Sequence, residues 1–167
     1  MTAWFLLKLI HVFAGAFWFG AAVLMIYFIA PAVKATAPAG GAVMGHLNGK
    51  LKMASMIAMA AWITTLSGVL LIVRLRESFE SGYLGTLQGA ALAAGAVMGI
   101  LTFVSAVFVQ LPRSKRIAAL GAEAGPTPTP EQAAEIQAEQ KKFANGGHIV
   151  IALFVLALLG MLMSHPI

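Results

Sequence analysis

The sequence predicts an all-α integral membrane protein, folded as an antiparallel bundle of four spanning helices. Of its 167 residues, 60% are hydrophobic and 10% are charged, whereas a soluble domain carries about 25% charged residues. Four apolar stretches, at about 3–30, 53–73, 87–111 and 148–164, approach or exceed the length of about 20 residues that a bilayer requires. Such continuous apolar runs are typical of helices, because hydrocarbon leaves no partner for an unpaired backbone group. We expect residues 1–167 to form a single membrane domain.

The positive residues predict the orientation of this bundle. The first and third connections carry eight lysine and arginine residues and the second carries two; these are Lys34, Lys50, Lys52, Arg113, Lys115, Arg116, Lys141 and Lys142, against Arg74 and Arg76. By the positive-inside rule, the first and third connections lie in the cytoplasm and both termini lie outside. The net charge of +5 therefore indicates topology and a lipid bilayer as partner, not nucleic acid. Cysteine is absent, which excludes disulfides and thiolate metal sites.

The first connection is rich in proline and glycine until about residue 42. Val43, Met44 and Leu47 then predict a short interfacial helical segment, on which His46 lies. In the second span, the polar side chains of Thr64, Thr65 and Ser67 are expected to bond to a preceding carbonyl or to a neighbouring helix.

The third span carries small residues at helical spacing: Ala91, Gly95 and Gly99. Small residues let helix backbones approach closely. Helix contacts within one chain explain this stripe, and a homodimer seam is the alternative. The span is expected to end at Gln110-Leu-Pro112, before the basic cluster.

The third connection predicts a short cytoplasmic helix over about 130–144. Thr129 suits its N-cap, Pro130 its first position and Gln132 a capping box. The run Asn145-Gly146-Gly147 is expected to end this helix by C-cap chemistry, and the fourth span then begins at His148.

The candidate site lies on the first span. At 3.6 residues per turn, one stripe contains Trp4, Lys8, His11, Gly15, Trp18, Ala22 and Met25. An ionisable group inside a membrane is a functional-site hypothesis, because hydrocarbon solvates it badly. A histidine with a glycine one turn away suits a b-type haem, since imidazole ligates the iron and the missing side chain leaves room for the porphyrin. Trp4 and Trp18 would pack on the macrocycle, and Lys8 would pair with a propionate.

The alternative for the same stripe needs no cofactor. His11 would then hydrogen-bond across the bundle to Thr64, Thr65 or Ser67, and Lys8 would extend to the outer headgroups.

A second axial ligand is not evident. His165 falls at the outer boundary and His148 at the inner one, so neither matches the depth of His11. A haem at His11 would be five-coordinate, or would take a methionine, a lysine or a group from another chain. His46 and His148 share the cytoplasmic side and form an alternative metal site. Met53, Met56 and Met59 invite a copper interpretation, although methionine is also ordinary core material.

Lys8-Leu-Ile-His11, followed by Phe17-Trp18-Phe19-Gly20, resembles the first helix of two families. These are the copper-resistance D-like membrane proteins and the small membrane-bound protoporphyrinogen oxidases, multi-helix inner-membrane proteins mostly of prokaryotes. The resemblance implies an inner-membrane location and haem binding through His11. At the positions of an arginine and a histidine in the oxidase pattern, this chain has Tyr27 and Ala32. The resemblance therefore implies haem ligation without protoporphyrinogen chemistry, as in a separate branch of this superfamily.

The sequence thus predicts haem b binding in the outer half of the bundle, with an electron-transfer or redox role. The two alternatives are a cofactor-free accessory subunit of a larger bioenergetic membrane complex and a protein that handles copper or another metal. No acid–base pair, nucleophile constellation or phosphate loop is recognisable, so the sequence assigns no enzymatic activity.

Overall fold

The computed structural model describes residues 3–37, 39–74, 82–125 and 127–164, and all regular elements in these ranges are helices. Four helical segments are long and apolar enough to cross a membrane: Ala3–Ala35, Met53–Arg74, Leu87–Ala124 and Pro130–Met163. The expectation of an all-helical membrane protein with four apolar spans is confirmed.

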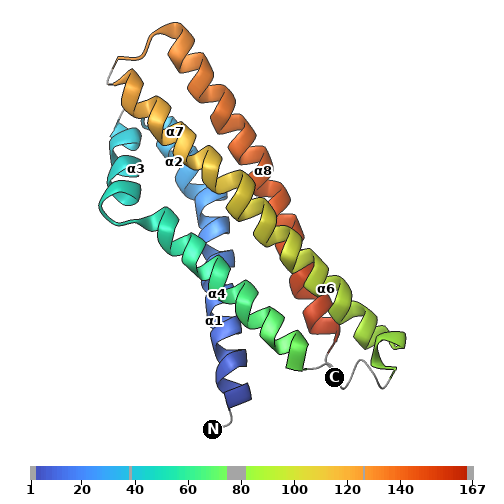
Figure 1. Ribbon diagram of the computed structural model, residues 1–167. Helices are drawn as coiled ribbons and strands as arrows, with labels where there is room; N and C mark the ends of the chain where they lie inside the picture. Colours follow the sequence, from blue (N-terminus) through green and yellow to red (C-terminus); the bar gives the residue numbers. More distant parts are fainter. Residues whose placement is uncertain (1–2, 38, 75–81, 126, 165–167) are drawn as a thin grey trace.

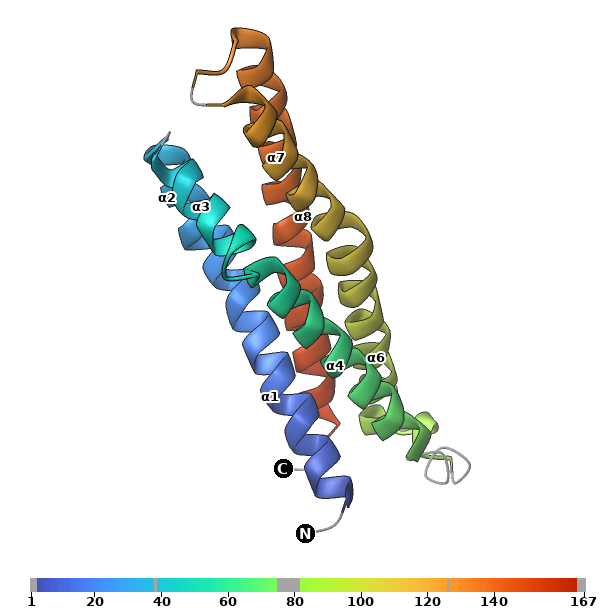
Figure 2. The same ribbon diagram turned by 60° about the vertical axis from the view of Figure 1, so that its left-hand side comes forward.

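The four segments form two helix pairs (Figures 1 and 2). In the first pair α1 (Ala3–Leu24) packs mainly against α4 (Met53–Arg74), and in the second α6 (Leu87–Val104) packs mainly against α8 (Pro130–Met163). The start of α1 and the end of α8 lie at one end of the bundle, which we term the terminal end. Helices α2 (Ala30–Ala35), α3 (Ala39–Gly49) and α7 (Leu111–Ala124) lie toward the other end. This basic end carries the eight lysine and arginine residues of the first and third connections.

Two spans continue past a proline through a π-helical turn. Segment η1 (Met25–Ile29) precedes Pro31 of α2, and η3 (Ser105–Gln110) precedes Pro112 of α7. Proline has no N–H group, and its ring clashes with the carbonyl four residues earlier. A widened π turn shifts the hydrogen bonds to five-residue spacing and removes that conflict. The helix that contains the third span therefore continues past Pro112 to Ala124, and the helix that contains the first span continues to Ala35. The expected end of the membrane span at Gln110-Leu-Pro112 stays a prediction.

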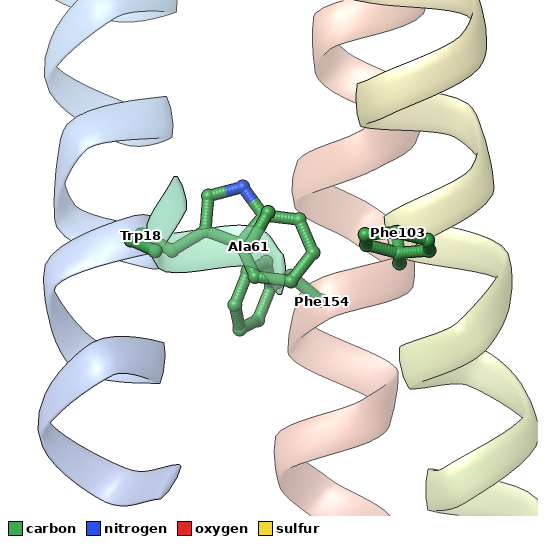
Figure 3. Packing of buried hydrophobic residues seen from close by; sticks show 5 residues of the cluster. Trp18, Ala61, Phe103 and Phe154 are labelled. Atoms are coloured by element: carbon green, nitrogen blue, oxygen red, sulfur yellow. The ribbon is translucent and has the colours of Figure 1, made fainter. Parts of the chain in front are cut away.

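A group of aromatic and small side chains joins the two helix pairs near the middle of the bundle. Trp18, Phe103 and Phe154 are all buried and pack around Ala61 (Figure 3). Trp18 meets Phe154 edge to face, with ring centroids 4.8 Å apart. Edge-to-face aromatic pairs add about 0.5–1.5 kcal/mol beyond the area that they bury. This contact makes Trp18 a core residue that links α1 to α8.

Helix α8 does not break where the sequence suggested. Thr129 caps it with the expected capping box, but the helix then runs without interruption from Pro130 to Met163. The predicted end at Asn145-Gly146-Gly147, and hence the separate helix over 130–144, was wrong. The two glycines serve close packing instead: a Cβ atom at Gly146 would lie 2.5 Å from Oε1 of Gln110, and one at Gly147 would clash with Ile26.

Small residues of α6 make a close helix contact with α8 of the same chain. A Cβ atom at Gly160 of α8 would lie 2.6 Å from the carbonyl oxygen of Ala91 and 2.7 Å from Cα of Gly95. The backbones of α6 and α8 therefore touch, as the spacing of Ala91 and Gly95 predicted. A Cβ atom at Gly99 would have no neighbour within 4 Å among the described residues, so Gly99 takes no part in this contact.

Helix α3 confirms the helical segment expected in the first connection, but it starts at Ala39. Gly40 is buried, and a Cβ atom there would clash with the carbonyl oxygen of Val33. The turn into α4 places Lys52 at φ 54°, a left-handed conformation that side chains other than glycine, asparagine and aspartate seldom adopt. This turn joins the end of α3 to the start of α4.

Candidate functional site

Two members of the predicted stripe, His11 and Gly15, face α4, and His11 is hydrogen-bonded across this seam. Nδ1 of His11 lies 2.8 Å from the carbonyl oxygen of Thr64 and 3.3 Å from the hydroxyl oxygen of Ser67. A carbonyl oxygen can only accept a hydrogen bond, so Nδ1 carries the proton and donates a hydrogen bond to the carbonyl oxygen of Thr64. In the neutral imidazole, Nε2 then holds a lone pair. Thr64 and Ser67 were two of the three hydrogen-bond partners expected for His11 if it binds no cofactor. The group of Thr64 that accepts the hydrogen bond is its backbone carbonyl, not its hydroxyl.

The imidazole occupies a space that a glycine leaves open on α4. A Cβ atom at Gly68 would lie 2.8 Å from Cε1 and 3.2 Å from Nδ1 of His11. Any larger residue there would move the ring or separate the helices. Sequence reasoning missed Gly68, although a glycine directly after the polar run of the second span was a usable signal.

The space beside Gly15 has room for about one methyl group. A Cβ atom at Gly15 would lie 3.4 Å from the methyl carbon of Thr64, an ordinary van der Waals contact. The prediction that Gly15 leaves room for a porphyrin edge does not fit this arrangement, because the facing helix fills the gap. A single methyl group at Gly15 would fit against Thr64, but the larger porphyrin edge would not.

The other predicted members of the site lie apart from the imidazole. Trp18 is 3% exposed and belongs to the aromatic core, so it has no free face for a macrocycle. Lys8 is exposed one turn from His11, toward the terminal end, and its Nζ atom lies 5.1 Å from the centre of the Trp4 ring. At this distance the Lys8 ammonium group makes a cation–π contact with Trp4. Trp4 therefore contacts Lys8, which stays at the surface.

The two histidines of the alternative metal site, His46 and His148, lie at the basic end. His46 is exposed on α3, and His148 is exposed on α8, where its Nδ1–H donates to the carbonyl oxygen of Ala144 at 2.7 Å. The His148 ring also meets Tyr27 edge to face, with ring centroids 5.4 Å apart. Within the described ranges, no group of three or more His, Asp or Glu side chains gathers that could hold a metal ion. His165 and Arg76 lie outside the described residues.

A cavity of about 130 Å³ lies between the two helix pairs on the basic side of Trp18. Its walls are mostly apolar and come from seven helical elements: α1, η1, α3, α4, η3, α7 and α8. Among the lining residues are Ala22, Met25, Met44, Asn48, Met53, Ala54, Ile57, Ala58, Val107, Gln110, Ser114 and Phe143. Nε2 of Gln110 donates to the carbonyl oxygen of Phe143 at 2.7 Å. Oδ1 of Asn48 is buried and has no hydrogen-bond partner among the described residues. Sequence reasoning missed this cavity, because its walls come from segments far apart in the chain.

Comparisons with protein-family models, curated proteins and solved structures find no match for this chain. The class of the protein therefore follows from its own fold. Its four apolar helices define a multi-pass membrane protein in contact with a lipid bilayer.

Proposed function

We propose that this protein binds haem b through Nε2 of His11 and serves an electron-transfer or redox role in a prokaryotic inner membrane. The four spans are antiparallel in this proposal, with the basic end in the cytoplasm and both termini outside. The orientation rests on the distribution of lysine and arginine, and the location rests on the resemblance of the first helix.

One observation carries the haem proposal: the hydrogen bond from Nδ1 of His11 to the carbonyl oxygen of Thr64. Histidines that ligate metals almost always donate their other ring N–H to a carbonyl, a carboxylate or water. Such a bond fixes the ring orientation and the tautomer, and it makes the ligating nitrogen more basic. Here it leaves Nε2 as the nitrogen available to an iron atom.

The chain's other contributions follow from the same seam. Gly68 permits the ring to lie against α4, and the exposed Lys8 offers a cation for a propionate one turn away. Haem supplies one-electron chemistry when bound, at a potential that its ligands and surroundings set. Thr64 leaves room for only about one methyl group beside Gly15, and Trp18 is buried in the core. Gly15 and Trp18 are therefore not part of the haem surface in this proposal.

Absorption spectroscopy of the full chain, purified in a mild detergent from haem-replete cells, tests the proposal. We expect a Soret band and a pyridine haemochrome typical of haem b in the parent protein and in His148→Ala, and loss of both in His11→Ala. A His11→Gly variant supplied with free imidazole should regain the band if the histidine acts as the ligand. Colourless parent protein, or an unchanged band in His11→Ala, would overturn the proposal.

A cofactor-free accessory subunit is the second candidate, and one observation favours it. The bond to Thr64 already satisfies one polar atom of His11 in a helix contact, so the imidazole has a structural use of its own. This candidate predicts a colourless protein that co-purifies with defined membrane subunits. Copper handling through His46 and His148 predicts stoichiometric copper that is lost when both are replaced.

A further inference from the structure

We propose that the cavity at the basic end holds part of one acyl chain of an anionic phospholipid, whose phosphate lies beside the lysines that flank the cavity. This inference does not rest on haem binding, because the cavity lies on the other side of Trp18 from His11.

The size and lining of the cavity indicate the kind of occupant. Its volume is about 130 Å³, and alanine, methionine and isoleucine dominate its walls. An apolar cavity of about 150 Å³ stays dry and accepts a molecule of the size of benzene. The present cavity therefore accommodates several methylene groups but not a whole lipid. An occupant that fits is a chain that enters at one end while its remainder lies outside.

The polar groups of the lining place the glycerol region of that lipid. Gln110 is engaged with the carbonyl oxygen of Phe143, whereas Asn48 has a buried amide oxygen without a partner among the described residues. An unpaired buried polar atom is destabilising, and a ligand that supplies a hydrogen bond removes this penalty. A phospholipid offers ester carbonyls to an amide N–H, and the headgroup of phosphatidylglycerol offers hydroxyls to an amide oxygen. The lipid therefore offers a hydrogen-bond partner to the Asn48 amide in either of its two orientations.

The charges around the cavity favour an anionic headgroup over a neutral one. Lys50 and Lys52 follow Asn48 in the turn to α4, immediately before the lining residue Met53, and both are exposed. Arg113 stands between the lining residues Leu111 and Ser114, and its guanidinium donates to the carbonyl oxygen of Lys142 at 3.3 Å. Basic pockets between spanning helices on the cytoplasmic side bind anionic headgroups. A neutral quinone would use the apolar walls and Asn48 but would gain little from these cations.

Binding of defined lipids to the delipidated full chain, measured by native mass spectrometry and by thermal unfolding, tests the inference. The probes are palmitoyl-oleoyl phosphatidylglycerol, the phosphatidylcholine with the same chains, and glycerol 3-phosphate. We expect the phosphatidylglycerol to bind most tightly and to raise the unfolding temperature, and glycerol 3-phosphate, which has no acyl chain, not to bind.

Two sets of variants separate the acyl chain from the charge. Ala58→Leu fills the cavity and should abolish binding of the phosphatidylglycerol, whereas Ala94→Leu, on an exposed position of α6, should not. Replacing both Lys50 and Lys52 by glutamine should weaken binding by roughly fivefold for each charge removed, while Arg74→Gln at the terminal end should leave it unchanged. The lysine variants change only exposed side chains, so they report on binding even where Ala58→Leu fails to fold.

Equal binding of the two phospholipids would overturn the inference, as would undiminished binding to a folded Ala58→Leu protein. Binding of a quinone that depends on Ala58 but not on the lysines would also overturn it, by assigning the cavity to a neutral ligand.

Discussion

The two helix pairs use glycine for different purposes. Between α6 and α8, Gly95 and Gly160 bring backbone against backbone, and a Cβ atom at Gly160 would meet main-chain atoms. Between α1 and α4, Gly68 faces the His11 ring, and a Cβ atom there would meet a side chain. Main-chain atoms move only when a whole helix moves, whereas a ring can rotate.

The difference separates a contact between helix backbones from a contact that holds a polar side chain. Close backbone contact between spanning helices is a way to gain van der Waals energy when lipid and side chains are equally apolar. The α1–α4 seam instead uses a glycine to accommodate the imidazole of His11, whose Nδ1 is hydrogen-bonded to Thr64. If the α6–α8 contact is structural and the α1–α4 seam is functional, substitutions at the two glycines should have separable effects.

Gly160→Ala should have the largest effect on stability. The new Cβ atom would lie 2.6 Å from the carbonyl oxygen of Ala91, so α6 and α8 must separate, and overpacking of this kind costs about 1–3 kcal/mol. Denaturant and thermal unfolding in detergent measure the loss of unfolding free energy. Gly99→Ala is the matched control on α6, because the methyl group that it adds meets no described atom within 4 Å. An equal loss in both variants would show that the backbone contact is not special.

Gly68→Ala should have a smaller effect on stability and a larger one on His11. The added methyl displaces the ring and lengthens its hydrogen bond to Thr64, whose loss costs about 1 kcal/mol. If His11 ligates haem, the same variant should shift the Soret maximum or the midpoint potential. Gly20→Ala, at a position with no described atom within 4 Å of the added methyl, serves as control on α1. A loss as large as that of Gly160→Ala would contradict the separation between a structural contact and a functional one.

Ser67→Ala should have the smallest effect. Its hydroxyl lies 3.3 Å from Nδ1 of His11, whereas the Thr64 carbonyl lies at 2.8 Å and remains in place. The hydroxyl of Ser67 also donates to the carbonyl oxygen of Ile63, which belongs to the same helix. Hydrogen bonds between spanning helices average about 0.6 kcal/mol, and we expect a change of unfolding free energy no larger than this. A loss above about 1.5 kcal/mol, beyond the usual range for a single hydrogen bond, would identify the hydroxyl as the main partner of the imidazole.

Local chemistry predicted several features correctly because neighbouring residues alone decide them. Thr129 and Gln132 form the expected capping box, since both groups lie within one turn. The spacing of Ala91 and Gly95 predicted a close helix contact, because a small side chain permits it whichever helix approaches. The stripe that contains His11 was likewise set by helical periodicity.

The errors fall where a distant segment changes the meaning of a local signal. Gly146 and Gly147 resemble a helix end, yet contacts with Gln110 and Ile26 stabilise a continuous helix there. Gly15 suggested a space for a ligand, yet Thr64 lies within van der Waals contact of a single added methyl group. Asn48 gave no signal in the sequence, because its unpaired amide oxygen becomes significant only when seven helical elements come together around the cavity.

The sequence by itself determined that this protein resides in a membrane and has four spanning helices, since hydropathy and length act locally along the chain. Only the tertiary structure decided which atom accepts the hydrogen bond of His11, where the helices remain unbroken and where a cavity lies. These properties depend on pairs of residues that are far apart in the chain, and the free energy of each pair exists only when the helices meet.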